Sequence, residues 1–217
     1  EFLVDGDEFF LLEMNTRLQV EHPVTEAICD LDLVRLQLDI ASGCALEIRQ
    51  QDVQMLGHAI EARVYAEDPA ANFAPATGTL LACGFSHIEG VRIDRGVSTG
   101  STVGHFYDGL LCKVIAHGDD REQATGRLQR ALRELQLSGL QSNQKLLLAV
   151  LDSSCWRNAE HHIGTLEQSL GSWLETTRPS ITEEVMCRFS IAIVLYAQEG
   201  MVSIAVVDVP TPAPKAV

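Results

Sequence analysis

Residues 13–26 read EMNTRLQVEHPVTE, and every second residue from Glu13 to Glu21 is polar or charged. Successive side chains of an extended chain point to opposite sides, so this spacing predicts a strand whose five polar groups share one face and which ends at Pro23. A polar strand face is most often simply solvated. This one carries both signs of charge and two amides, which favours recognition of a charged, planar ligand.

Two apolar-rich runs precede this stretch, and an Asp-Gly-Asp sequence at residues 5–7 joins them. Asp-Gly between such runs is a strong signal for a hairpin. If Val4 pairs with Glu8, then Glu1 and Glu13 become diagonal neighbours across the two strands, about 7–8 Å apart. Two carboxylates at that separation can converge on a hard cation such as Mg²⁺.

Further along the chain, hydrophobic spacing predicts both helices and strands. Leu128, Leu132 and Leu135 recur at helical spacing and mark the strongest helix. Glycines divide the region from Thr79 to Ile115 into short runs, which is typical of an antiparallel meander. The expected elements are a helix at 30–41, a strand at 57–66, a turn-rich loop at 69–78, the meander, and helices at 120–137, 144–152 and 183–198. The fold class that follows is α+β.

The composition limits the partners and the compartment. The 217 residues are 46% hydrophobic and 21% charged, with a net charge of −14 at pH 7. We expect no nucleic-acid or membrane partner, because no Lys/Arg cluster is available for phosphates and no apolar run approaches the roughly 18 residues that span a bilayer. Six cysteines without paired spacing indicate free thiols in the cytoplasm, or in the mitochondrial matrix of a eukaryote. The chain opens on Glu1 in a strand-like pattern, which predicts a fragment of a longer protein.

The stretch EMNTRLQVEHPVTE resembles the signature of the biotin carboxylases, the ATP-grasp enzymes of acetyl-CoA, propionyl-CoA, pyruvate and related carboxylases. The resemblance continues in the family's order through GHAIEARVYAEDP, NFAPATGTL, VRIDRGV, YDGLLCKVIAHG and RALRELQLSGLQSN, and so covers roughly residues 1–170. It implies the C-terminal portion of an ATP-grasp domain at 1–50 and the biotin carboxylase C-terminal domain, an antiparallel sheet with packed helices, at 51–172. Residues 173–217 stay unassigned and are a candidate start of a linker domain.

The resemblance also implies sites for metal and nucleotide. Glu1 and Glu13 resemble the family's two metal-binding glutamates, and Asn15 resembles a further ligand of the second metal ion. Leu3 and Leu140 resemble the apolar positions that pack on the adenine ring, although both could equally be plain core. The cofactors implied are ATP, two Mg²⁺ or Mn²⁺ ions, and biotin carried on another domain.

The alternating segment supplies the bicarbonate pocket in this resemblance. Arg17, Gln19 and the backbone N–H of Val20 match the groups that bind bicarbonate, and Glu21 matches the general base that deprotonates it. The chemistry is suitable, because a guanidinium forks onto a planar oxyanion while an amide and an N–H complete its shell.

The strand at 57–66 supplies the biotin site. Arg63 matches the residue that holds the ureido oxygen of biotin and stabilises the enolate formed when N1′ loses its proton, which a fixed cation does well. Asp108 is the salt-bridge partner that the resemblance suggests for Arg63. Taken alone, an arginine on a strand is more often a surface residue or a structural ion pair.

The implied activity is the ATP-dependent carboxylation of biotin with bicarbonate, through carboxyphosphate. The family's lid and its phosphate-contacting lysines are absent from this sequence, so we expect the chain alone to be inactive toward ATP. The implied partners are bicarbonate, a biotinylated carrier domain, a carboxyltransferase subunit or domain, and a second copy bound through the C-terminal domain, where Arg92 lies. The final carboxyl acceptor is not encoded here. Two alternatives remain: another ATP-grasp ligase that joins a carboxylate to an amine, and a non-catalytic dimerisation scaffold.

Overall fold

The computed structural model describes residues 1–176, in which the elements follow one another as short strands and helices. The first half contains β1 (Phe2–Asp5), β2 (Glu8–Leu11), α1 (His22–Cys29), α2 (Leu33–Ala41), β3 (His58–Tyr65), β4 (Glu67–Asp68), β5 (Ala74–Pro75), β6 (Gly78–Thr79) and β7 (Ala82–Gly84), with single 3₁₀ turns at Gln50–Asp52 and Pro69–Ala71. The second half contains β8 (Val91–Arg95), β9 (Thr102–Val103), β10 (Leu110–Gly118), α3 (Arg121–Glu134), β11 (Gln136–Ser138), α4 (Gln144–Asp152), α5 (Ser154–Arg157) and α6 (Thr165–Thr176).

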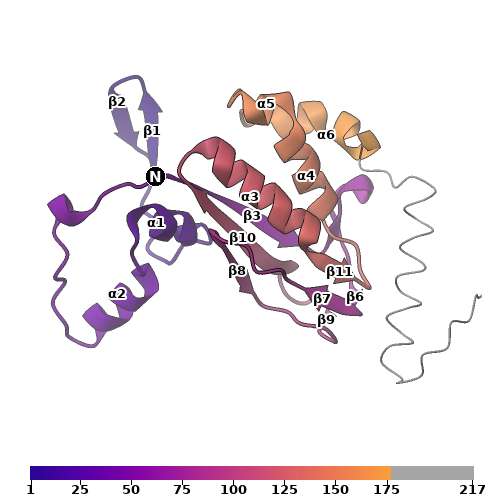
Figure 1. Ribbon diagram of the computed structural model, residues 1–217, viewed down its shortest axis with the longest axis horizontal. Helices are drawn as coiled ribbons and strands as arrows, with labels where there is room; N and C mark the ends of the chain where they lie inside the picture. Colours follow the sequence, from indigo (N-terminus) through magenta and orange to yellow (C-terminus); the bar gives the residue numbers. More distant parts are fainter. Residues whose placement is uncertain (177–217) are drawn as a thin grey trace, which may run out of the picture. The chain divides into compact units, whose positions relative to one another are not determined.

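A three-stranded antiparallel sheet in the order β3-β10-β8 is the centre of the fold (Figure 1). Lys113 in the middle of β10 lies opposite Arg63 of β3 and opposite Asp94 of β8. Directly paired residues of an antiparallel sheet share a face, so these three side chains lie on the same side. Four shorter strand pairs lie outside this sheet, among them the β1-β2 hairpin.

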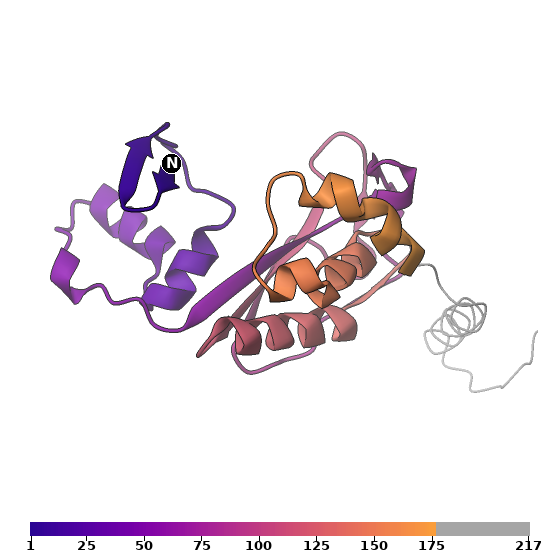
Figure 2. The same cartoon turned by 90° about the horizontal axis from the view of Figure 1, so that it is seen from above.

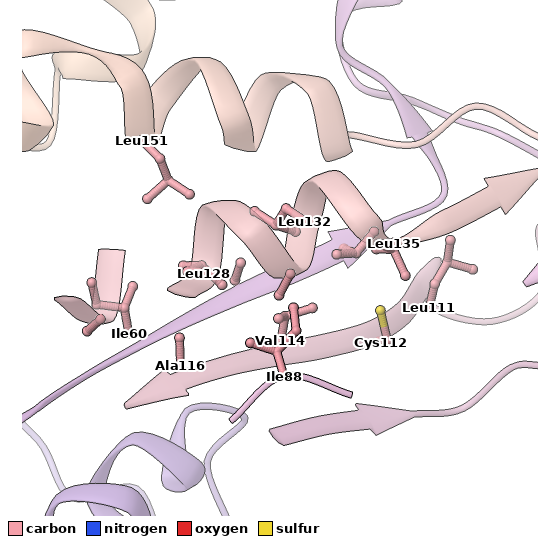
Figure 3. Packing of buried hydrophobic residues seen from close by; sticks show 14 of the residues in the cluster. Ile60, Ile88, Leu111, Cys112, Val114, Ala116, Leu128, Leu132, Leu135 and Leu151 are labelled. Atoms are coloured by element: carbon pink, nitrogen blue, oxygen red, sulfur yellow. The ribbon is translucent and has the colours of Figure 1, made fainter. Parts of the chain in front are cut away.

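The hydrophobic core fills the other side of the sheet, under α3 (Figures 1 and 3). Val114 of β10 and Val64 of β3 are fully buried, and they pack in one cluster with Leu128 and Leu132 of α3. Helix α4 adds Leu151 to this cluster, and Figure 2 shows the helices layered over one side of the sheet. The alternation of buried and less buried residues along β3 therefore separates an apolar face from a polar one.

Helix α3 begins and packs as its sequence predicts. The side chain of Asp120 accepts a hydrogen bond from the backbone N–H of Gln123 (2.8 Å), which satisfies one of the free amides of the first turn. The residues at helical spacing face the sheet and are buried. The α+β fold class is thereby confirmed, as are the helices at 30–41, 120–137 and 144–152 and the strand at 57–66, with ends that shift by a few residues.

The N-terminal segment differs from the prediction in three ways. The hairpin pairs Val4 with Phe9 rather than with Glu8, because the turn contains only two residues and Gly6 adopts a left-handed φ of 59°. Two-residue turns of this kind match the twist of the strands. Residues 13–21 form no strand, and a turn at 20–21 leads directly into α1, where Pro23 occupies the first helical turn instead of ending a strand.

Helices α1, α5 and α6 were not expected from the sequence, whereas the expected helix at 183–198 lies outside the described residues. So does most of the segment 173–217 that the resemblance left unassigned. Among the described residues no helix is both long and apolar enough to cross a membrane.

Candidate functional site

An ion pair joins the segment before α1 to the polar face of the sheet. Nη2 of Arg63 donates to Oε2 of Glu21 over 2.7 Å, although the two residues are 42 positions apart. The Arg63 side chain is 39% exposed and that of Glu21 53% exposed, so solvent and ligands can reach both. An exposed pair of this kind contributes little to stability, about 0–1 kcal/mol. The family resemblance assigned both residues to one site, and in the structure their side chains are in contact.

A buried carboxylate lies beside this pair. The side chain of Glu61, two residues before Arg63 on the same face of β3, is only 4% exposed, and Oε1 lies 3.5 Å from Nε of Arg63. Neither carboxylate oxygen accepts a hydrogen bond from the described protein groups. Burial raises the pKa of Glu61, while the positive charges of Lys113 and Arg63 oppose that rise.

Lys113 of β10 ties the segment before α1 to the sheet. Its Nζ donates to the carbonyl oxygen of Val20 (2.9 Å) and lies 3.5 Å from a carboxylate oxygen of Asp94. The lysine side chain is 13% exposed, so this hydrogen bond is largely shielded from water. The backbone that carries the proposed bicarbonate groups is thereby held at a fixed point above the sheet.

A second charged contact anchors α1 itself. Glu26 of α1 is 6% exposed and accepts from Nη1 of Arg92 (2.6 Å) and from the backbone N–H of Leu33 (2.8 Å). Arg92 also binds Asp94 through Nε (2.7 Å), and these acidic partners raise its pKa, chiefly the Asp94 hydrogen bond. Arg92, which lies in the region expected to form dimer contacts, therefore already has partners within the chain.

The three groups expected to bind bicarbonate are largely unused by the protein. Arg17 donates only to the neighbouring carbonyl of Leu18 (3.3 Å). Within residues 1–176, the Gln19 amide and the N–H of Val20 make no hydrogen bond. Free donors of this kind suit an oxyanion, which needs N–H groups directed at it. The donor set therefore fits the expected ligand.

The expected metal ligands are only partly gathered. Nδ2 of Asn15 lies 3.2 Å from Oε1 of Glu1, and the nitrogen of Glu1 donates to the carbonyl oxygen of Glu13 (2.6 Å). The observed hairpin register does not make Glu1 and Glu13 the diagonal pair predicted above, since Phe2 pairs with Leu11 and Glu1 therefore lies opposite Leu12 rather than Leu11. Oxygen ligands from Glu1 and Asn15 fit a hard cation. In the described part of the chain no three His, Cys, Asp or Glu side chains form a metal-binding group.

Asp108 is not the partner of Arg63, which corrects the pairing that the resemblance suggested. Its carboxylate accepts from the backbone N–H of Leu110 (3.1 Å), while Arg63 binds Glu21 and Glu61 instead. An aspartate two residues before a free amide forms this local bond readily. Whether Asp108 contacts biotin stays a prediction.

The two leucines expected at the adenine ring have different environments. Leu3 lies in the β1-β2 hairpin and is 57% exposed, so it is not core. Leu140 packs against the hydrophobic core cluster, which agrees with the plain-core alternative.

Two open clefts, of about 460 and 480 Å³, lie between the α1–α2 region and β8, and Glu26, Leu31 and Arg92 line both. None of the expected site residues lines either cleft. The candidate site is thus the exposed surface around Arg63 and the segment 15–21, not one of these hollows.

Sequence reasoning missed Glu61 and Lys113. Period-two spacing places Glu61 and Arg63 on one face of β3, and this signal could have revealed Glu61. Lys113 could not be found in this way, because its place beside Arg63 depends on the register of β10 against β3, which the sequence does not give.

Comparison with known proteins identifies two family models in the chain. Residues 61–168 match the biotin carboxylase C-terminal domain. Residues 1–49 match the ATP-binding domain of the carbamoyl-phosphate synthase L chain.

Similar proteins of known name and similar solved structures agree with these models. The chain is 44% identical over 171 residues to biotin carboxylase 2 of Bacillus subtilis, covering 78% of this chain and 38% of that protein. It is also 44% identical over 163 residues to the mitochondrial propionyl-CoA carboxylase alpha chain of Caenorhabditis elegans, covering 74% and 22%. The biotin carboxylase domain dimer of Hydrogenobacter thermophilus 2-oxoglutarate carboxylase, in complex with MgADP, ADP and bicarbonate, superposes with a TM-score of 0.76 at 34% identity, covering 79% and 38%. The chain thus spans well under half the length of these relatives.

Proposed function

The chain belongs to the biotin carboxylase family, and on that premise we propose that it supplies the carboxylation half of a site that carboxylates biotin with bicarbonate at the expense of ATP. In this proposal biotin is attached to a separate carrier domain, since no lysine of this chain stands between two methionines, the sequence context of a biotin-attachment site. The single observation that carries the proposal is the 2.7 Å contact between Glu21 and Arg63, beside donors that the protein leaves free.

In this proposal Arg17, Gln19 and the N–H of Val20 bind bicarbonate, because they are the unused donors of the segment before α1. Glu21 takes the bicarbonate proton, since an ionised carboxylate at the end of that segment can reach a ligand held by its neighbours. Arg63 holds the ureido oxygen of biotin and stabilises the negative charge that develops there. The base would therefore act on bicarbonate and the cation on biotin, and the 2.7 Å contact between them brings the two reactants to the same place.

Glu1 and Asn15, with Glu13, would hold the Mg²⁺ or Mn²⁺ ions that accompany ATP, and the contact between the first two supports this assignment. The metal would supply charge neutralisation at the phosphate oxygens. Leu3, which is exposed, would contact the adenine ring, and the resemblance gives the same role to Leu140, which packs against the core cluster.

We further propose the domain division at residues 50 and 172 and a set of partners. The partners are a biotinylated carrier, a carboxyltransferase subunit or domain, and a second copy of the chain. The support for a second copy is that a similar solved structure is a dimer of biotin carboxylase domains. Five free cysteines among the described residues agree with a reducing compartment, the cytoplasm or a mitochondrial matrix. An amine ligase is not favoured, because about half of the chain, residues 61–168, matches the biotin carboxylase C-terminal domain.

The experiment uses a chimera of Bacillus subtilis biotin carboxylase 2 in which this chain replaces the matching segment. Arg63→Ala and Glu21→Gln should each lower biotin-dependent ATP turnover by about 100-fold or more, since each removes charge from the reacting centre. Arg130→Ala is the matched control, because Arg130 forms an exposed ion pair with Glu134 on α3 and contacts no site residue. A folded chimera without biotin-dependent turnover, or two variants that retain it, would overturn the proposal.

A further inference from the structure

The guanidinium of Arg63 has a carboxylate on each of two sides, one exposed to solvent and one buried. Nη2 contacts the exposed Glu21, and Nε faces the buried Glu61 over 3.5 Å. Nη1 makes no hydrogen bond with any residue that the structure describes. Of the two carboxylates, Glu21 is the one that solvent and ligand reach. Glu61 is enclosed and therefore has no direct access to a substrate.

The burial of Glu61 is unfavourable for the fold. Desolvation raises its pKa above that of an unfolded chain, although Arg63 on its own strand and Lys113 on β10 oppose the rise and the Glu21 charge adds to it. As pH rises past the ordinary glutamate range the unfolded state therefore loses this proton first, so the free energy of unfolding falls. Stability thus gives no reason for a carboxylate at this position, and both of its oxygens lack a hydrogen-bond donor from the protein.

We propose that Glu61 is a positioning residue, whose buried carboxylate holds the Nε edge of Arg63 so that the guanidinium stays in place when Glu21 exchanges a proton or turns to a ligand. The contact is electrostatic, because 3.5 Å is too long for a good hydrogen bond. Because Glu61 holds Nε, only the two Nη groups of Arg63 remain for Glu21 and for a negatively charged ligand atom. This inference rests on the proposed role of Arg63 at the biotin oxygen.

Arginine side-chain NMR on the full 217-residue chain tests the proposal without any activity assay. The Nε–H signal of Arg63, assigned by its loss in Arg63→Lys, should exchange with water about tenfold faster in Glu61→Gln than in the parent. Glu21→Gln should leave that Nε–H rate unchanged, because Glu21 binds Nη2. Glu134→Gln is the control, since Glu134 pairs with Arg130 on α3 and contacts neither Arg63 nor Glu61.

Two further readouts separate positioning from a structural role. The urea midpoint of Glu61→Gln should be unchanged or higher than that of the parent at pH 7, because a buried charge has been removed. In the unmodified chain, the protection of the Arg63 Nε–H, measured relative to free arginine at the same pH, should fall as pH is lowered through the titration of the Glu61 carboxyl group, and this readout requires no mutant. An unchanged Nε–H protection in Glu61→Gln and across that titration would overturn the proposal. A failure of the chimera with intact Nε–H coupling would instead reject only the catalytic assignment.

Discussion

At the scale of single residues, burial decides which thiols can react. Cys112 on β10 is 2% exposed, and burial together with the nearby Cys83 raises its pKa to about 12. At pH 8 only about one Cys112 in ten thousand is then a thiolate, the form that reacts with alkylating agents. Cys44, by contrast, is exposed after the end of α2.

We therefore expect iodoacetamide at pH 8 to modify Cys44 rapidly and to leave Cys112 unmodified in the folded chain. Mass spectrometry of the digested protein measures both rates. Reaction in concentrated urea is the control, because both thiols should then be modified at similar rates. Comparable labelling of the two cysteines without urea would mean that β10 is not buried as described.

The residue scale also shows what resemblance can and cannot supply. Glu21 and Arg63 were each assigned a role from a matching motif, yet the partner suggested for Arg63 was Asp108. Motifs state which residue types recur in order, whereas an ion pair depends on how two segments meet in space. The N–H of Val20 was assigned to bicarbonate by resemblance, and the structure gives it no acceptor within residues 1–176, but the assignment itself stays a prediction.

At the scale of elements, two glycines with positive φ provide a matched comparison. Gly139, directly after β11, has a φ of 102°, and a Cβ there would collide with the backbone of Thr79 and Leu81. Gly100 has a φ of 87° but faces open space. Both positions disfavour a side chain for conformational reasons, and only Gly139 adds a steric one.

Gly100→Ala should lower the free energy of unfolding by about 1 kcal/mol, the cost of a left-handed conformation. Gly139→Ala should lower it by about 3 kcal/mol or more, because the backbone of Thr79 at the end of β6 and of Leu81 before β7 must also move. Urea denaturation with linear extrapolation measures the difference. Equal losses in the two variants would contradict the close approach at Gly139.

Helices with a clear cap and a periodic apolar face were predictable from the sequence. Asp120 and the leucines of α3 define that helix locally, so its position needed no tertiary information. The segment 13–21 was misassigned because alternating polarity was taken for a strand, and a strand needs a partner for its backbone groups. Helix α1 was missed because Pro23 was taken as an end of pairing, although proline is also favoured in a first helical turn.

At the scale of the whole molecule, the candidate site depends on a junction that the sequence could not specify. The segment before α1 meets the sheet through Glu21 and through the carbonyl of Val20, both on the polar face. That face opposes the one that α3 covers, so one sheet carries the core on one side and the site on the other. Sequence spacing predicted the polar row as one strand, whereas in the structure the row is an irregular segment that ends in a turn and meets the polar face of the sheet.

Lys113 is the test of that junction. Replacing it by glutamine removes the charge that binds the Val20 carbonyl, so the turn before α1 should open more often. The amides of His22 and Val24, which donate to Gln19 and Glu21, should then exchange hydrogen about tenfold faster, the factor expected for one largely buried, charge-assisted hydrogen bond.

Hydrogen-exchange mass spectrometry or NMR measures these amides alongside those that pair β10 with β3, which should keep their protection because the sheet's own hydrogen bonds are intact. Lys145→Gln is the control, since Lys145 lies exposed on α4 and should change neither group. Equal protection at His22 and Val24 in the Lys113 variant and the parent would show that the segment before α1 is held by α1 packing alone. Faster exchange confined to these amides would instead establish that one lysine of the C-terminal sheet holds the proposed bicarbonate-binding backbone in place.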